Sequence, residues 1–530
     1  MTERSFLRGA VVLIAASLVT RIMGFVYRIF LTRIIGAQGI GLFQIVFPLL
    51  SLVLTFVTAG LPVAISKLVA EALVQQDRVR VQRILRVSTG VIGTMTVIFT
   101  LLMWLMRGFV SSHWLTDPRA YPTYLAMIPI VSIIAVSSVY RGYFQGLQDM
   151  APPAWASILE QTVRILSVWV LAAYFVRFSL AYAAAGAMVG MLLGELAGMV
   201  FLIVAYRRRG RISYVLPNAP ARSLETVRQT LRAITKIAAP VTGSRLIWSL
   251  IYAIEPILVT RSLWLAGVAK DTSTALYGQY GGMALPLLVF PTVITGSLAV
   301  NLVPSVSEAM AGETRNDRQV RIRVDQSWRV TAIVGFPTSI VLTLFATPLC
   351  AMIYREPSVG PILALMAPVG FLLYLQAPFA GILQGLDKAG LAMVNSIAGG
   401  VVRLGLIYVL ASQPHLGIYG VAIATSISVV LTAVLHFIGI VHYVGFPIRL
   451  IDTLKIAVAS LISLIGMLAL SRGHAAQLSG THLLSAILFG FILYFTLLCS
   501  FRVLTSRSIR RIPRIGPVLA NIVSYLPFAV

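Results

Sequence analysis

The sequence is poor in charged residues and has very few cysteines. Only 11% of its 530 residues are Asp, Glu, Lys or Arg, against about 25% in soluble domains, whereas 58% are hydrophobic. Its two cysteines, Cys350 and Cys499, lie in separate apolar segments, so neither a disulfide framework nor a thiolate metal site is indicated. The six histidines form no zinc-like cluster. The composition therefore excludes an ordinary soluble domain and indicates a polytopic membrane protein.

Acidic residues are scarce beside basic ones, with 17 Asp and Glu against 42 Lys and Arg. In a chain this apolar, the net charge of +25 indicates cytoplasmic loops facing anionic membrane lipids rather than a nucleic-acid partner. The sequence also lacks a phosphate-binding loop, a dinucleotide fingerprint and a nucleophile elbow. We therefore predict that the chain is not an enzyme and has neither a cofactor nor a metal.

Long apolar runs separated by turn signals predict about fourteen membrane helices in an all-α fold. Crossing a bilayer takes roughly 20 apolar residues, and each run is long enough. The helices are expected near 7–35, 42–70, 87–110, 121–147, 154–176, 180–206, 234–265, 277–306, 327–353, 360–383, 390–412, 416–444, 452–471 and 482–503.

Positive charge alternates along the connections between these helices. The second, sixth and eighth helices are each followed by an arginine-rich connection, and so is the last, whereas the alternate connections carry little Lys or Arg. Arginine-rich connections mark the cytoplasmic side of a membrane protein. The pattern places both termini in the cytoplasm, with the basic tail 504–530 lying on anionic lipid.

The chain echoes itself with an offset near 238 residues. Gln145-Gly146-Leu147 and Arg164 recur as Gln384-Gly385-Leu386 and Arg403. The offset spans six helices, an even number, so both copies enter the membrane in the same orientation, as in parallel transporter repeats. This predicts two parallel six-helix lobes and two extra helices. The expected segments are an N-lobe at 1–206, a basic cytoplasmic linker at 207–233, a C-lobe at 234–445, helices 13 and 14 at 446–503 and the tail.

Two arginines interrupt the first apolar run. Arg21 and Arg28 are seven residues apart, so they lie on nearly the same helix face, on the order of 10 Å apart along the axis. Facing lipid they would be costly, whereas a water-filled cavity or an anion would accommodate them. The alternative is that they reach the headgroups and do nothing else, above all for Arg28.

The other charges inside predicted helices are few. Glu160 and Arg164 are four residues apart and can pair along one helix, Glu195 lies among small residues, and Glu255 precedes the helix-kinking Pro256. A local salt bridge is the alternative to a functional role for these acids. Arginine exceeds acid, so a shared cavity would be cationic and suited to phosphate. The candidate substrate-binding residues are Arg21, Arg28, Arg164, Arg245 and Arg403, and the candidate coupling or structural acids are Glu160, Glu195 and Glu255.

A set of motifs runs nearly the full length of the chain. They are Thr20-Arg21-Ile22-Met23-Gly24-Phe25, Ile35-Gly36-Ala37, the stretch 60–72, Arg141-Gly142-Tyr143-Phe144-Gln145-Gly146, Gly243-Ser244-Arg245 with Glu255-Pro256, and Arg510-Arg511-Ile512-Pro513. In these motifs the chain resembles the MurJ-like lipid flippases of the multidrug/oligosaccharidyl-lipid/polysaccharide exporter superfamily. The resemblance implies a V-shaped cavity between two six-helix lobes.

The resemblance also implies roles for individual residues. Arg21 matches an arginine that the family uses in its first helix, whereas Arg28 falls one residue past the family's next arginine, where this chain has Tyr27. Family arginines in the second and eighth helices have no counterpart here, and Tyr280 stands near the latter place. That Arg245 supplies the missing charge is a hypothesis.

We therefore predict a cell-membrane flippase that moves a lipid-linked peptidoglycan or polysaccharide precursor by alternating access. The resemblance implies that it does so for spore cortex synthesis. Its partners would be the lipid-linked anionic substrate and anionic membrane lipids. One alternative is a cation-coupled drug exporter of the same fold, which would need an acidic cavity. Another is a membrane scaffold that recruits cell-wall synthesis enzymes, in which the interior arginines would be dispensable.

Overall fold

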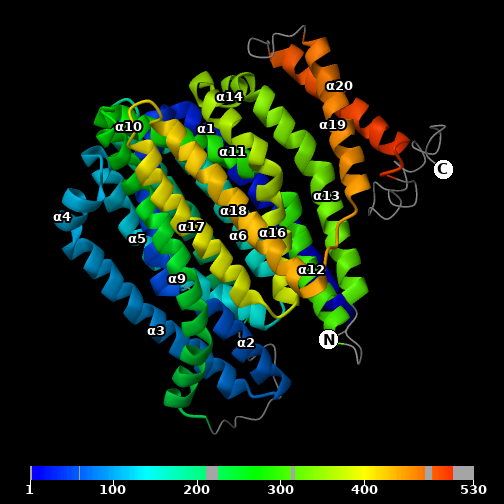
Figure 1. Ribbon diagram of the computed structural model, residues 1–530. Coiled ribbons are helices and arrows are strands. Elements are labelled where there is room, and N and C mark those ends of the chain that lie inside the picture. Colours follow the sequence, from blue (N-terminus) through cyan, green and yellow to red (C-terminus); the bar gives the residue numbers. More distant parts are fainter. Residues whose placement is uncertain (1–2, 59, 211–224, 312–316, 472–479, 505–530) are drawn as a thin grey trace. The chain divides into compact units, whose positions relative to one another are not determined.

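The computed structural model describes residues 3–58, 60–210, 225–311, 317–471 and 480–504 (Figure 1). Across these residues the fold is helical without a strand, which confirms the all-α prediction. The predicted tail, from residue 505 on, and most of the predicted linker, at 211–224, lie outside the described residues.

The first half of the chain forms long helices joined by short connections. Its elements are α1 (Glu3–Thr58), α2 (Leu61–Val74), α3 (Arg78–Leu105), α4 (Arg107–Phe109), η1 (Val110–Trp114), η2 (Pro118–Ala120), α5 (Tyr121–Gly146), α6 (Ala151–Phe175), α7 (Leu180–Ala205), η3 (Tyr206–Gly210), α9 (Val227–Leu265) and α10 (Lys270–Tyr277).

The second half continues the same pattern with more interruptions. Its elements are η4 (Gly278–Ala284), α11 (Leu285–Val289), α12 (Thr292–Ala311), α13 (Asp317–Leu344), α14 (Ala346–Tyr354), η5 (Pro357–Val359), α15 (Gly360–Met366), η6 (Ala367–Val369), α16 (Gly370–Gly385), α17 (Ala389–Ala411), α18 (Ile418–Val444), α19 (Leu450–Leu470) and α20 (Gly480–Ser500).

Thirteen stretches of the described chain are long and apolar enough to cross a membrane. The first, Ala16–Val74, contains two of the predicted helices, and each of the other predicted helices has its own stretch. The expectation of about fourteen crossings therefore agrees with the structure. The predicted helix at 277–306 is broken, because Pro291 lacks an N–H and the chain restarts as α12 at Thr292.

Helix α1 bends sharply at Gly36, which divides it into two arms. Gly36 has φ 64° and ψ −174°, a backbone conformation that only glycine adopts readily. A straight helix of 56 residues would be about 84 Å long, far more than the roughly 30 Å of a bilayer core. The bend lets one continuous helix supply two crossings.

The chain divides into two compact units. One comprises residues 1–282 together with 407–418, and the other comprises residues 283–406 together with 419–530. Compactness and repeat symmetry are different properties, so the lobes predicted from the repeat, 1–206 and 234–445, stay a prediction.

In the first unit, α7 packs against α5 and α6, and α1 packs against α6, α9 and α10. The contact of α6 with α7 is tight because glycines recur every four residues on one face of α7, at positions 186, 190, 194 and 198. A Cβ on Gly194 would lie 2.7 Å from the Glu160 carbonyl oxygen and 2.8 Å from the Arg164 Cβ. Only a glycine permits this separation of the two helices.

The second unit has an aromatic centre. Trp328 of α13 stacks on Phe379 of α16 with ring centroids 6.1 Å apart and meets Phe371 edge-on at 5.2 Å. Its indole nitrogen donates to Thr453 of α19 at 2.9 Å, which satisfies the one polar atom of the ring. Helix α19 in turn packs beside α20 (Figure 1).

Candidate functional site

An open pocket surrounds Arg21 in the first unit. Its volume is about 430 Å³, and its walls come from α1, α5, α6 and α7. The Arg21 side chain is exposed, and within the described part of the chain its guanidinium has no ion pair or hydrogen bond. The residues of this Arg21 pocket are Thr20, Arg21, Ile134, Arg141, Ser157, Glu160, Gln161 and Glu195.

Two ion-paired arginines and two glutamates form a network at the wall of the Arg21 pocket. Arg141 donates to Glu160 Oε2 at 2.7 Å and to Ser157 Oγ at 2.7 Å. Arg164 donates to Glu160 Oε1 and to Glu195 Oε1, both at 2.6 Å. These four charges cancel, so with Arg21 added the five charged groups carry a net positive charge.

The local sequence explains how the network assembles. Glu160 and Arg164 are four residues apart on α6, which places them on one helix face. The glycine face of α7 brings Glu195, the neighbour of Gly194, against the same arginine. The predicted pairing of Glu160 with Arg164 is present, and the bond of Glu195 to a neighbouring helix is present too. The Arg164 guanidinium therefore already serves two carboxylates, and its role in substrate binding stays a prediction.

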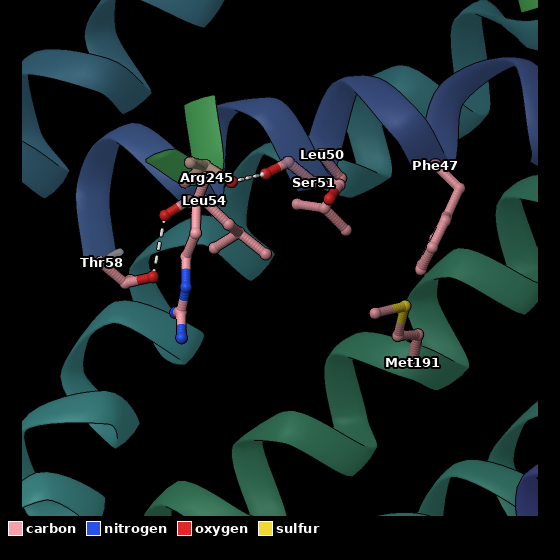
Figure 2. A pocket seen from close by; sticks show the side chains of 8 residues that line it. Phe47, Leu50, Ser51, Leu54, Thr58, Met191 and Arg245 are labelled. Atoms are coloured by element: carbon pink, nitrogen blue, oxygen red, sulfur yellow. Dashed lines mark hydrogen bonds between the residues drawn. The ribbon is translucent and has the colours of Figure 1, made fainter. Parts of the chain in front are cut away.

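Arg245 lines a second pocket of about 220 Å³ (Figure 2). Its side chain reaches from α9 past Thr58 into the space below the second arm of α1, with no ion pair or hydrogen bond to its guanidinium in the described residues. Thr55 and Thr58 also line this pocket, and their hydroxyls donate to the carbonyls of Ser51 and Leu54. The residues of this Arg245 pocket are Phe47, Leu50, Ser51, Leu54, Thr55, Thr58, Met191 and Arg245.

The two pockets share a wall. Met191 lines the Arg245 pocket and Glu195 lines the Arg21 pocket, and both belong to α7. Residues four apart lie one above the other on a helix face, with Cβ atoms about 5–6 Å apart. The pockets therefore adjoin along α7, and each contains an arginine whose guanidinium has no partner among the residues that the structure describes.

Arg28 and Glu255 do not line either pocket. Arg28 is half-buried, and its Nη1 donates to the Gly281 carbonyl at 3.5 Å, beside Gln44 Nε2, which donates to the same oxygen at 3.0 Å. Glu255 is buried on α9, where Oε1 accepts from the Tyr280 hydroxyl at 3.2 Å. Arg28 therefore contacts the protein backbone rather than only solvent or headgroups. The assigned substrate and coupling roles of both residues stay predictions.

Arg403 belongs to the second unit. It lies half-buried on α17. Its predicted role as a substrate ligand stays untested. Likewise, no group of three or more His, Cys, Asp or Glu among the described residues could hold a metal ion.

The structure also assigns residues that the sequence pattern did not single out as ligands. Arg141, Ser157 and Gln161 line the Arg21 pocket, although only Arg141 belongs to a recognisable motif. The signal was weak because Arg141 and Glu160 are 19 residues apart on different helices, a separation that carries no periodic pattern. Gln161 Oε1 accepts from Arg164 at 3.3 Å.

Outside the membrane-spanning segments, Asp117 anchors a further ion cluster. It accepts from Arg119 Nη2 at 2.7 Å and from the Thr274 hydroxyl at 2.9 Å, and Arg119 also pairs with Asp271 at 3.0 Å. Burial by itself raises the pKa of the Asp117 carboxyl, but the hydrogen bonds from Arg119 and Thr274 outweigh it and hold that pKa below its usual value. The cluster ties η2, which precedes α5, to α10.

Comparison with solved structures identifies the fold. The structure matches an inward-facing multidrug resistance MATE family transporter of the MOP superfamily with TM-score 0.65, at 16% identity, over 80% of this chain and 94% of that one. It matches the lipid II flippase MurJ in an inward closed conformation with TM-score 0.63, at 14% identity, over 92% of this chain and 98% of that one. The protein is therefore a multi-pass membrane protein with the MOP transporter fold.

Sequence comparison gives the family. A family model described as polysaccharide biosynthesis protein matches residues 6–310, and the chain belongs to that family. It is 38% identical to stage V sporulation protein B of Bacillus subtilis over 98% of this chain and all of that protein. It is 24% identical to the lipid II flippase MurJ of Bacillus subtilis over 87% of both chains.

Proposed function

We propose that the protein flips a lipid-linked peptidoglycan or polysaccharide precursor across the cytoplasmic membrane by alternating access, for spore cortex synthesis. The observation that carries the proposal is the Arg21 pocket, where an unpaired guanidinium stands in an open cavity within a membrane protein. An unpaired arginine at this position is costly unless an anion or water meets it. Guanidinium binds phosphate bidentately, so the diphosphate that links such lipids to their sugars is a suitable ligand.

The relatives support the same direction. The sporulation protein and the flippase named above share nearly the full length of the chain, and the family name refers to polysaccharide biosynthesis. In this proposal the diphosphate and sugars occupy the Arg21 and Arg245 pockets, and the lipid tail stays in the bilayer. The other predicted ligands, Arg28, Arg164 and Arg403, have no assigned role in this proposal, and their part in substrate binding stays a prediction.

Reconstitution tests the proposal directly. The purified full-length protein is placed in vesicles with a fluorescent lipid-linked disaccharide-peptide diphosphate, and translocation is measured by its accessibility to an added membrane-impermeant quencher. We expect Arg21→Ala to reduce the rate at least tenfold while leaving the amount of folded protein unchanged, since about one charge-assisted contact is lost. Asp452→Asn, which removes the 3.7 Å pair with Arg329 in the second unit, is the control and should translocate normally. Full activity of Arg21→Ala would overturn the proposal.

A cation-coupled exporter of drug-like molecules is the second candidate, because the MATE family transporter matches the fold. Export of a cationic dye from the same vesicles separates the two candidates. We expect no dye export, because a cation would meet the unpaired Arg21 and Arg245 in both pockets. A non-transporting scaffold would move neither the lipid-linked precursor nor the dye across the vesicle membrane.

A further inference from the structure

The Arg21 pocket contains a second guanidinium, that of Arg141 on α5. Its side chain is 26% exposed, and it is held by Glu160 on one side and by Ser157 on the other. Arg21 reaches the same pocket from α1. The pocket thus presents two arginines from two helices, one without a partner and one with a carboxylate already bound.

The Glu160 carboxylate holds Arg141 in the way that a phosphate oxygen would. Its Oε2 accepts from Arg141 Nη2 at 2.7 Å, the length of a charge-assisted hydrogen bond. The same guanidinium hydrogens form the usual contacts to phosphate. An anion that binds Arg141 from the pocket through this Nη2 hydrogen must therefore compete with Glu160.

Glu160 can release Arg141 without becoming an unpaired buried charge. Its other oxygen, Oε1, stays bonded to Arg164 at 2.6 Å, and Arg164 is also held by Glu195. A buried carboxylate that lost every partner would be strongly destabilising. Because this one keeps Arg164, the exchange costs a single contact.

We propose that Glu160 is a resident counter-ion of the Arg21 pocket, and that a substrate diphosphate displaces it from Arg141. This inference rests on the proposed function and deepens it. Before binding, Glu160 neutralises Arg141, so the empty pocket does not hold two unpaired cations within the membrane. After binding, Arg21 and Arg141 both contact the diphosphate, and Glu160 remains with Arg164.

The exchange makes the pocket selective for charge. A diphosphate ester brings enough negative charge to replace the carboxylate, whereas an uncharged glycolipid headgroup would leave Arg141 with Glu160. Lipid-linked sugars are therefore admitted through their diphosphate rather than through their hydroxyl groups. Lipids of the bulk membrane with neutral headgroups are excluded by the same contact.

Calorimetric titration of the full-length protein in phosphatidylcholine nanodiscs tests the exchange. The probes are farnesyl diphosphate, inorganic pyrophosphate and uncharged farnesol, which separate a lipid diphosphate from a free one and from the chain alone. For farnesyl diphosphate, Glu160→Gln should lower the Kd about tenfold, because the competing charge is lost, and Arg141→Gln should raise it about tenfold. The Kd of Arg141→Lys should lie between those of wild type and Arg141→Gln, since an ammonium keeps the positive charge but not the planar arrangement of donors.

Matched variants and folding controls keep the test decisive. Asp452→Asn removes a carboxylate from an ion pair in the second unit and should leave the Kd unchanged. Thermal unfolding of each variant shows whether it is folded, and Ser157→Ala offers a milder change at the same arginine. Equal affinities for wild type and Glu160→Gln would overturn the displacement. An affinity of Arg141→Gln for farnesyl diphosphate equal to that of wild type would show that Arg141 does not bind the diphosphate.

The outcomes separate this inference from the proposed function. If wild type translocates the lipid-linked diphosphate but the Arg141 and Glu160 variants bind like wild type, the inference fails and the function stands. If wild type neither binds farnesyl diphosphate nor translocates the precursor, the proposed function itself fails. Tighter binding of pyrophosphate than of farnesyl diphosphate would assign the site to free diphosphate instead of lipid.

Discussion

At the scale of single residues, the number of carboxylates bound to each arginine determines its role at the pocket. Arg164 is bound by two carboxylates, Arg141 shares one of them, and Arg21 has none in the described structure. Arginine thus has three roles around this pocket. Arg164 is a structural tie, Arg141 makes an exchangeable contact, and Arg21 is open to bind an anion. Arg21 and Arg141 line the Arg21 pocket, whereas Arg164 does not.

Asp117 gives a residue-scale prediction about pH. Its carboxyl has a pKa below the usual value in the folded protein, so the charged form contributes stability above the unfolded pKa, and this contribution is lost as the pH falls through the folded pKa. We expect Asp117→Asn to reduce the free energy of unfolding by about 1–3 kcal/mol at pH 7, since Arg119 and Thr274 lose a charged acceptor. Thermal unfolding from pH 7 down to pH 3 measures the difference.

The variant and wild type should begin to converge as the pH falls below about 4, where the unfolded carboxyl takes up a proton, and should become equal only below the lower pKa of folded Asp117. Asp387→Asn is a suitable control, since no ion pair or side-chain hydrogen bond involves that carboxylate in the described structure. A deficit that stays constant from pH 7 to pH 3 would show that the charge of Asp117 plays no part.

The sequence predicted only some of the ion pairs that the structure shows around the Arg21 pocket. The Glu160–Arg164 pair was readable because both residues lie on one helix at a spacing of four. The bonds from Arg164 to Glu195 and from Arg141 to Glu160 join different helices, so they depend on packing that no local pattern encodes. For the same reason Arg141 was missed as a pocket residue.

At the scale of elements, α7 controls the site through its spacing from α6. Glycines at 186, 190, 194 and 198 let the two helices meet backbone to backbone. This close contact is what places Glu195 within 2.6 Å of Arg164. Charge pairing and helix packing are therefore parts of one arrangement.

A methyl group at Gly194 tests this coupling. Gly194→Ala would bring a Cβ to 2.7 Å from the Glu160 carbonyl oxygen, so we expect a loss of about 1–3 kcal/mol of stability from overpacking. Gly93→Ala on α3, where nothing lies within 4 Å, should be neutral or slightly stabilising, since alanine favours a helix by up to about 1 kcal/mol. Thermal unfolding of the two variants gives the comparison. Equal stabilities would show that the helices can separate freely.

At the scale of the whole molecule, the arginine-rich connections predict the orientation of the chain in the membrane. Helix α9 has 39 residues, about 58 Å at 1.5 Å per residue, so it extends beyond the bilayer core. Its apolar window begins only at Arg245, and Arg228 and Arg232 precede that window. We propose that this basic end and both termini face the cytoplasm.

Cysteine labelling tests that orientation. The native Cys350 and Cys499 are 0% and 1% exposed, so they give little background with a membrane-impermeant maleimide. Arg228→Cys and Ala269→Cys place exposed thiols at opposite ends of α9. In intact cells we expect the maleimide to label Ala269→Cys but not Arg228→Cys. In inside-out vesicles we expect it to label Arg228→Cys but not Ala269→Cys. Labelling of Arg228→Cys from outside would reverse the proposed topology.

The number of crossings was predictable because length and hydropathy alone define them. The break before α12 was missed, because a single helix was predicted over 277–306 and an apolar run hides the point where Pro291 interrupts it. The division into compact units was not evident either, because it depends on contacts between distant segments. Motifs identified the family, whereas the pockets required the folded chain.

The bend at Gly36 has a mechanical consequence. One arm of α1 carries Arg21, and the other carries Thr55 and Thr58 beside Arg245. Gly36 thus joins two helix arms, one of which lines the Arg21 pocket while the other lines the Arg245 pocket. A change in the angle between the two arms would therefore alter the walls of both pockets together.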